Sequence, residues 1–214
     1  MAITTYSELQ TAVANWMDRT DLTARIPEFI ALAEAKYNRD LSCIQMDKRA
    51  TASININSTE PQYLALPDDF NFMKRLRITS VAGRPLLAYR TPIQLAEFVA
   101  ARGDATGQPL YFTVFGPEME LAPVPDQSYT LEMTYKRDIP ALSNTQTTNW
   151  LLTQAPDAYL YGALLEAEPF MKNDSRISVW TAARQFVVDQ LNAQSQDKMF
   201  GASPIQMMPS GYTP

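Results

Sequence analysis

The chain has 214 residues, a net charge of −5, one cysteine and no histidine. A chain of this length buries roughly 70% of the surface that its unfolded form exposes, enough for one large domain or two small ones. The missing histidine removes the commonest general base and metal ligand, and a single cysteine excludes a thiolate zinc site and an intramolecular disulfide. We expect Cys43 to be a packing residue in a protein without a cofactor.

The N-terminal sequence MAITTYSELQ lacks the basic and apolar regions of a signal peptide. The chain has no run of about 18 apolar residues that could span a bilayer. We therefore expect a soluble protein with no membrane partner.

Charge is distributed unevenly along the chain. Residues 1–47 carry −3, residues 48–90 carry +4, residues 91–138 carry −4 and the remainder carries −2. The basic block contains Lys48, Arg49, Lys74, Arg75, Arg77, Arg84 and Arg90. Such a block could bind nucleic acid. Because its charges are dispersed and form no stripe, we interpret them as solvated strand faces whose partner is an acidic surface on a neighbouring subunit.

Two amphipathic helices are predicted at the N-terminus. Thr5 and Glu8 have the spacing of a capping box. The apolar face that follows contains Leu9, Val13, Trp16 and Met17. A second helix, with Pro27 in its first turn, has an apolar face of Ile26, Phe29, Ile30, Ala33, Tyr37 and Leu41. Because the connection is short, we expect an antiparallel helical hairpin.

From about residue 46 the apolar period changes to that of a strand. The sequence ATASININ places Ala50, Ala52, Ile54 and Ile56 on one side. Less regular strands are predicted at 63–66, 73–79, 85–89, 110–115, 119–122 and 129–135. Most connections are too short for crossovers, which favours antiparallel pairing. One helix interrupts the strands, with a capping box of Thr91 and Gln94 and an end at Gly103.

The C-terminal third returns to helix. The stretch WLLTQAPDAYLYGALLEAEPFMKND, which begins at Trp150, holds few charges, so its helix must be covered on most sides. Pro169 should end or kink this helix, and Asp174 can cap the next one. That last helix has a single apolar face of Ile177, Trp180, Val187, Val188 and Leu191.

The tail FGASPIQMMPSGYTP contains three prolines, which exclude a regular helix. Its apolar residues Ile205, Met207, Met208 and Tyr212 are too many for a purely solvated linker. We therefore expect the tail to be an assembly arm that becomes ordered on a partner.

Together these elements predict an α+β fold. Its parts are a helical hairpin (1–45), a β-rich antiparallel insert with one short helix (46–148), a helical pair that packs on the hairpin (149–199) and an extended C-terminal arm (200–214). Apolar faces on all the helices of both ends favour one shared helical bundle.

Two pairs of carboxylates have residue types that could serve a catalytic or metal site. Glu166 and Glu168 lie about 200° apart on a helix and cannot share a substrate, so at least one should pair with a neighbouring arginine, such as Arg176 or Arg184.

The second pair is Asp68 and Asp69, in the sequence LPDDFNF. Adjacent aspartates can contribute to a magnesium site, but nothing nearby supplies further ligands at a recognisable spacing. We expect them to cap the backbone of a turn before the next strand.

The stretch WLL, PDAYLYGALLEAEPF and ND before SRISVW resembles the signature of head-to-tail adaptor proteins of tailed bacteriophages, also called connector or head-completion proteins. The N-terminal sequence ITTYSELQTAVANWMDRTDLTARIPEFIALAEAKYNRDL is similar to their helical hairpin, and LALPDDF resembles a short element of their middle region. The resemblance covers most of the chain. It is a packing signature without catalytic residues, which indicates a structural protein and no enzyme.

The resemblance implies a homo-oligomeric ring, a dodecamer, bound beneath the portal protein, with a tail tube or nozzle protein docked below. Double-stranded DNA would pass through the lumen without sequence recognition. The protein would be made in the host cytoplasm and would reside in the virion at the head-tail junction. A helix that is apolar all round suits a subunit buried between neighbours, and an acidic chain suits a lumen that does not grip DNA.

The candidate interface residues are Lys74, Arg75, Arg77 and Arg84 in the basic block, and Ile205, Met207, Met208 and Tyr212 in the arm. An alternative of a different class stays open, a tail-associated, glycosidase-like hydrolase. Its carboxylates would be Asp68, Asp69, Glu118 or Glu120.

Overall fold

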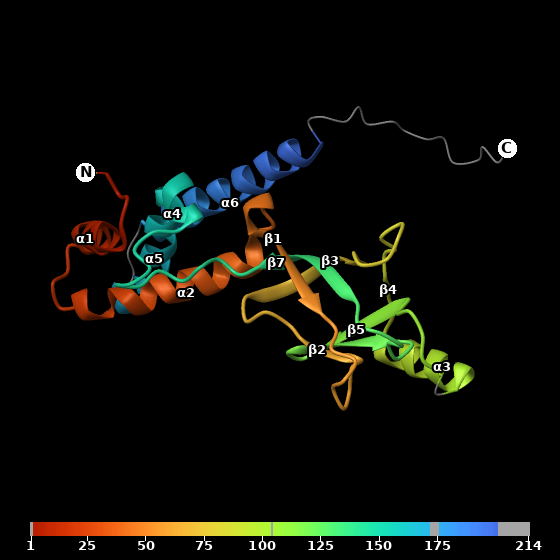
Figure 1. Cartoon of the computed structure of the whole chain (residues 1–214). Coiled ribbons are helices and arrows are strands. Elements are labelled where there is room, and N and C mark those ends of the chain that lie inside the picture. Colours follow the sequence, from red (N-terminus) through yellow and green to blue (C-terminus); the bar gives the residue numbers. More distant parts are fainter. Residues whose placement is uncertain (1, 104, 172–175, 201–214) are drawn as a thin grey trace. The chain divides into compact units, whose positions relative to one another are not determined.

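The computed structural model describes residues 2–103, 105–171 and 176–200 (Figure 1). These residues form six α-helices and two β-sheets, so the predicted α+β class is confirmed. The helices are α1 (Tyr6–Met17), α2 (Ile26–Asp40), α3 (Pro92–Arg102), α4 (Trp150–Gln154), α5 (Pro156–Met171) and α6 (Ile177–Phe200). The strands are β1 (Asp47–Ser53), β2 (Tyr63–Ala65), β3 (Phe70–Ile78), β4 (Ala88–Tyr89), β5 (Tyr111–Phe115), β6 (Glu118–Ala122) and β7 (Thr130–Arg137).

The chain divides into two compact units. The β unit is Asp47–Asp138, and the segments before and after it form the helical unit. The chain therefore leaves the helical unit after α2 and returns ahead of α4 (Figure 1). The returning segment belongs to the helical unit from residue 139 on, earlier than the boundary at 148 expected from the sequence, because Ile139 and Leu142 are buried in the helical core.

The local signals for α1 and α2 are present as predicted. Thr5 and Glu8 form the capping box of α1, and Pro27 lies in the first turn of α2. All the residues expected on the apolar face of α2 are buried. On the predicted apolar face of α1, Leu9, Val13 and Met17 are buried, but Trp16 is 45% exposed. The rings of Trp16 and Tyr161 pack edge to face, with their centroids 6.2 Å apart.

Helix α5 is enclosed within the helical unit, where it packs against α1, α2, α4 and α6. Its buried residues include Ala158, Tyr159, Ala163, Leu164 and Ala167. The apolar circumference of α5 is therefore covered by its own chain. The expectation that this helix must be covered on most sides is confirmed, and its burial gives no reason to place it between subunits.

The helical stretch from Trp150 is broken by a non-helical residue, Ala155, with φ −143° and ψ 71°, which separates α4 from α5. Pro169 lies inside α5, which continues to Met171. The proposed cap Asp174 lies outside the described residues. Glu166 pairs with Lys36 of α2 at 2.5 Å, whereas Arg184, one of the expected partners, pairs with Asp40.

Helices α2 and α5 approach each other closely at Gly162. A Cβ atom at this position would lie 2.6 Å from Tyr37 Oη and 3.1 Å from Ala33 Cβ. Tyr37 is fully buried, and its hydroxyl donates a hydrogen bond to the carbonyl of Ala158 at 2.6 Å. The absence of a side chain at Gly162 therefore permits this helix crossing.

A buried hydrogen-bond network joins α2 to the returning segment and to α5. Glu34 Oε1 accepts bonds from Leu142 N and from the Tyr159 hydroxyl, both at 2.9 Å. Asn149 Nδ2 donates to the same hydroxyl at 2.6 Å and to Pro140 O at 2.8 Å. Burial raises the pKa of Glu34, although the two donated bonds oppose that effect.

The β unit contains two sheets, with strand orders β1-β7-β3 and β2-β6-β5-β4. Pairing is antiparallel, as expected, except that β4 runs parallel to β5 over two residue pairs. The first strand ends at Ser53, before Ile54 and Ile56, and β4 is shorter than the predicted 85–89. The core between the sheets includes Leu76, Ile78, Phe112, Leu131, Met133 and Tyr135.

Gly162→Ala should destabilise the protein. In an ordinary helix interior this change adds about 1 kcal/mol of stability. Here the new Cβ would collide with Tyr37 and Ala33, so we expect the free energy of unfolding to fall by about 1–3 kcal/mol in urea titrations. The loss should be smaller when Tyr37→Phe has already removed the nearest atom. Equal losses in both backgrounds would contradict this explanation.

Glu34→Ala should lower the free energy of unfolding by about 2–4 kcal/mol, because two buried donors lose their acceptor. Glu34→Gln keeps an acceptor oxygen and should change it much less at neutral pH. Because the pKa of Glu34 is raised in the folded protein, folding favours its protonated form. The stability of the wild type relative to Glu34→Gln should therefore increase as pH falls toward the ordinary value of 4.5. A pH-independent difference would contradict this.

Candidate assembly site

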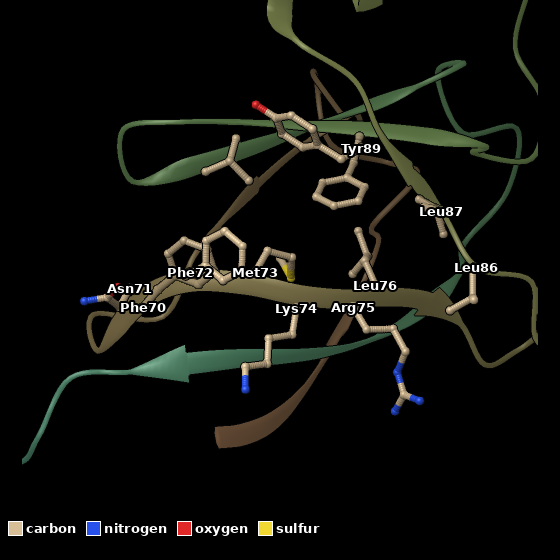
Figure 2. A pocket seen from close by; sticks show the side chains of 12 residues that line it. Phe70, Asn71, Phe72, Met73, Lys74, Arg75, Leu76, Leu86, Leu87 and Tyr89 are labelled. Atoms are coloured by element: carbon tan, nitrogen blue, oxygen red, sulfur yellow. The ribbon is translucent and has the colours of Figure 1, made fainter. Parts of the chain in front are cut away.

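Strand β3 presents different chemistry on its two faces. Leu76 and Ile78 point into the core of the β unit, and Arg75 and Arg77 alternate with them on the opposite face. Figure 2 shows Met73 and Leu76 on the side of β3 that faces Tyr89, with Lys74 and Arg75 on the other side. Irregularities between Phe70 and Phe72 and between Met73 and Arg75 interrupt the ladder with β7. The strand thus separates an apolar surface from a charged one.

On the charged face, three arginines surround one carboxylate. Glu132 of β7 has a side chain that is only 6% exposed, and it lies 2.6 Å from Arg77 Nη2, 3.3 Å from Arg49 Nη1 and 3.7 Å from Arg75 Nη2. The strand order β1-β7-β3 brings them together, since β7 lies between the other two. We call Arg49, Arg75, Arg77 and Glu132 the arginine cluster. Its positive charge exceeds the single negative charge at its centre, and Arg49 and Arg75 are exposed.

Two further ion pairs hold lysines of the basic block. Lys48 lies 2.7 Å from Asp69, which also accepts a hydrogen bond from the Tyr135 hydroxyl at 2.7 Å. Burial opposes ionisation of Asp69, but these two donors hold the pKa of its carboxyl below the usual value. Lys74 lies 2.6 Å from Asp47. The acidic partners of the basic block thus include residues of the same unit.

On the other face of β3 lies an apolar cleft of about 490 Å³ (Figure 2). It is lined by Phe70, Asn71, Phe72, Met73, Lys74, Arg75, Leu76, Leu86, Leu87, Tyr89, Phe112 and Val114. Phe72, Leu86 and Tyr89 are 61%, 64% and 57% exposed. Large apolar side chains gathered in this way mark a surface for a ligand or another protein.

The structure brings only some of the predicted interface residues together. Lys74, Arg75 and Arg77 lie on β3, whereas Arg84 lies in the turn between β3 and β4, with a φ of 45°. Ile205, Met207, Met208 and Tyr212 lie outside the described residues. Their role in an interface stays a prediction. The apolar cleft was missed, although Phe70, Phe72 and Met73 are close together in the sequence.

Nothing in the described residues favours the hydrolase alternative. Asp69 is held by Lys48 and Tyr135, and Glu118 and Glu120 lie on β6, in the other sheet. Burial raises the pKa of Glu120, and no charged neighbour among the described residues contributes to that shift. No group of three or more potential metal ligands occurs in the part of the chain that the structure describes.

None of the helices among the described residues combines the length and apolar character needed to cross a lipid bilayer. In comparisons with known proteins, no curated protein matches the chain. A protein family described as SU10 adaptor protein matches residues 4–207, which include both the helical unit and the β unit. The chain therefore belongs to the SU10 adaptor protein family and is a phage adaptor-type structural protein.

Proposed function

We propose that the protein is a head-to-tail adaptor. Twelve copies form a ring between the portal protein and the tail tube or nozzle of a phage virion, and double-stranded DNA passes through the lumen without sequence recognition. The observation that carries this proposal is the family match over residues 4–207. The protein would be made in the host cytoplasm and incorporated at the head-tail junction.

In this proposal the helices of both chain ends act as one bundle, and the β unit is an insert that offers surfaces to partners. The buried core shared by α1, α2, α5 and α6 supports a rigid helical body. The arginine cluster and the apolar cleft give the β unit two distinct contact surfaces.

Helix α6 carries an exposed apolar face that fits a contact between neighbouring subunits. Val179 and Phe186 are 65% and 63% exposed, whereas Trp180 and Val187, about 100° further around the helix, are buried. Positions seven residues apart lie on the same face of a helix, so Val179 and Phe186 form one stripe. A ring needs such a surface on each copy.

Phe186→Asp should prevent ring formation without unfolding the subunit, because the substituted side chain is exposed. Native mass spectrometry and electron micrographs of the protein mixed with its portal should show rings for the wild type and free subunits for the variant. Thr181→Asp, also exposed on α6 but about 140° around the helix axis from Phe186, is the matched control and should form rings. If Phe186→Asp still formed rings, the proposed contact through α6 would be wrong. A wild type that stays monomeric when mixed with portal would contradict the adaptor proposal itself.

The basic residues should contact protein rather than DNA. Several of them pair with carboxylates of the same unit, namely Glu132, Asp69 and Asp47. Together with the net charge of −5, this pairing disfavours binding to DNA phosphates. Fluorescence anisotropy with labelled duplex DNA should show little binding at physiological salt, and Arg49→Ser should leave it unchanged. Micromolar binding that weakens steeply as salt rises would contradict this, because that slope counts the phosphates neutralised.

A further inference from the structure

The apolar cleft of the β unit is left open by the described part of its own chain. Phe72, Leu86 and Tyr89 each expose more than half of their surface around it. Its volume of about 490 Å³ lies within the usual range for ligand sites, roughly 300–1,000 Å³. Filling the cleft would remove apolar surface from water, which favours binding against the cost of ordering the occupant.

The cleft suits an uncharged, extended peptide. Figure 2 shows Lys74 and Arg75 pointing away from the space between β3 and Tyr89. Strand β3 is an edge strand of its sheet, and residues 85–87 bond to its C-terminal part through Ile78 N and Leu76 O. An extended occupant along the remaining edge could therefore add backbone hydrogen bonds to its apolar contacts.

Residues 201–214, GASPIQMMPSGYTP, have this chemistry. They contain no charged side chain, and their apolar residues are Ile205, Met207, Met208 and Tyr212. Prolines at 204 and 209 disfavour helix and favour extended backbone in the residues before them. Methionine adapts its shape to irregular apolar surfaces. Eight extended residues span about 26 Å, enough to cross a cleft between two strands.

We propose that residues 205–212 of one copy of the chain bind the apolar cleft in the β unit of another copy. The inference rests on the proposed ring, in which every copy donates one segment and receives one. A modest affinity for each contact is sufficient there, because neighbours in a ring hold the segments at high effective concentration.

Disulfide cross-linking of full-length chains tests the contact. One chain carries Leu86→Cys and a second, differently tagged chain carries Met208→Cys; both keep Cys43, which is buried. After co-assembly and mild oxidation, a product containing both tags is expected. Thr59→Cys, exposed elsewhere in the β unit, replaces Leu86→Cys as the control and should give no such product. No cross-link to Leu86→Cys, or equal cross-linking to Thr59→Cys, would overturn the inference.

A chain that carries both Leu86→Cys and Met208→Cys separates contact within a chain from contact between chains. Cross-linked oligomers are expected, and a disulfide confined to single chains would overturn the exchange between copies. Rings without the cross-link would reject the cleft contact and leave the adaptor proposal intact.

If no rings form, binding of a synthetic peptide of residues 201–214 to the full-length protein decides the cleft contact separately. Leu86→Asp should raise the Kd of this peptide at least about tenfold, because a charge would face an apolar occupant. An unchanged Kd or no detectable binding by the wild type would overturn the inference.

Discussion

The helical unit depends on the hydrogen bonds that the buried side chain of Glu34 accepts. Glu34 accepts bonds from the amide of Leu142 and the hydroxyl of Tyr159, which are 108 and 125 residues away in the sequence. A polar group in an apolar core is costly unless it is hydrogen-bonded, so the segment returning from the β unit is held beside α2. Asn149 extends the network to the start of α4 by accepting a bond from Leu152 N. Residues from both ends of the chain thus contribute to one hydrophobic core.

Elements with strong local signals could be predicted from the sequence, because those signals act over a few residues. The capping boxes at Thr5 and Thr91 are examples. The helix crossing at Gly162 could not be predicted. A glycine within a helical pattern indicates only a lower helix propensity until its contact with Tyr37 is known. The break at Ala155 has a local cause in the sequence, because Pro156 disfavours helical backbone in the residue before it.

For the candidate site, the alternation along β3 was sufficient to place Arg75 and Arg77 on one face. The ion pairs that Arg49, Arg75 and Arg77 all make with Glu132 could not be predicted, because they depend on β7 lying between β1 and β3. Strand order is a property of the whole sheet. The cleft depends in the same way on strands from both sheets and on a connection that bonds first to β3 and then to β5.

The closed helical core and the exposed surfaces together separate stability from assembly. Helix α5, the most apolar element, is covered by its own unit, so the subunit does not need neighbours to bury it. The apolar side chains left exposed include Val179 and Phe186 on α6, and Phe72, Leu86 and Tyr89 around the cleft of the β unit. In the proposed assembly, such a subunit would fold before it assembles, because the surfaces offered to partners do not belong to the buried core. Substitutions on those surfaces would then act on association, whereas substitutions in the Glu34 network would act on folding.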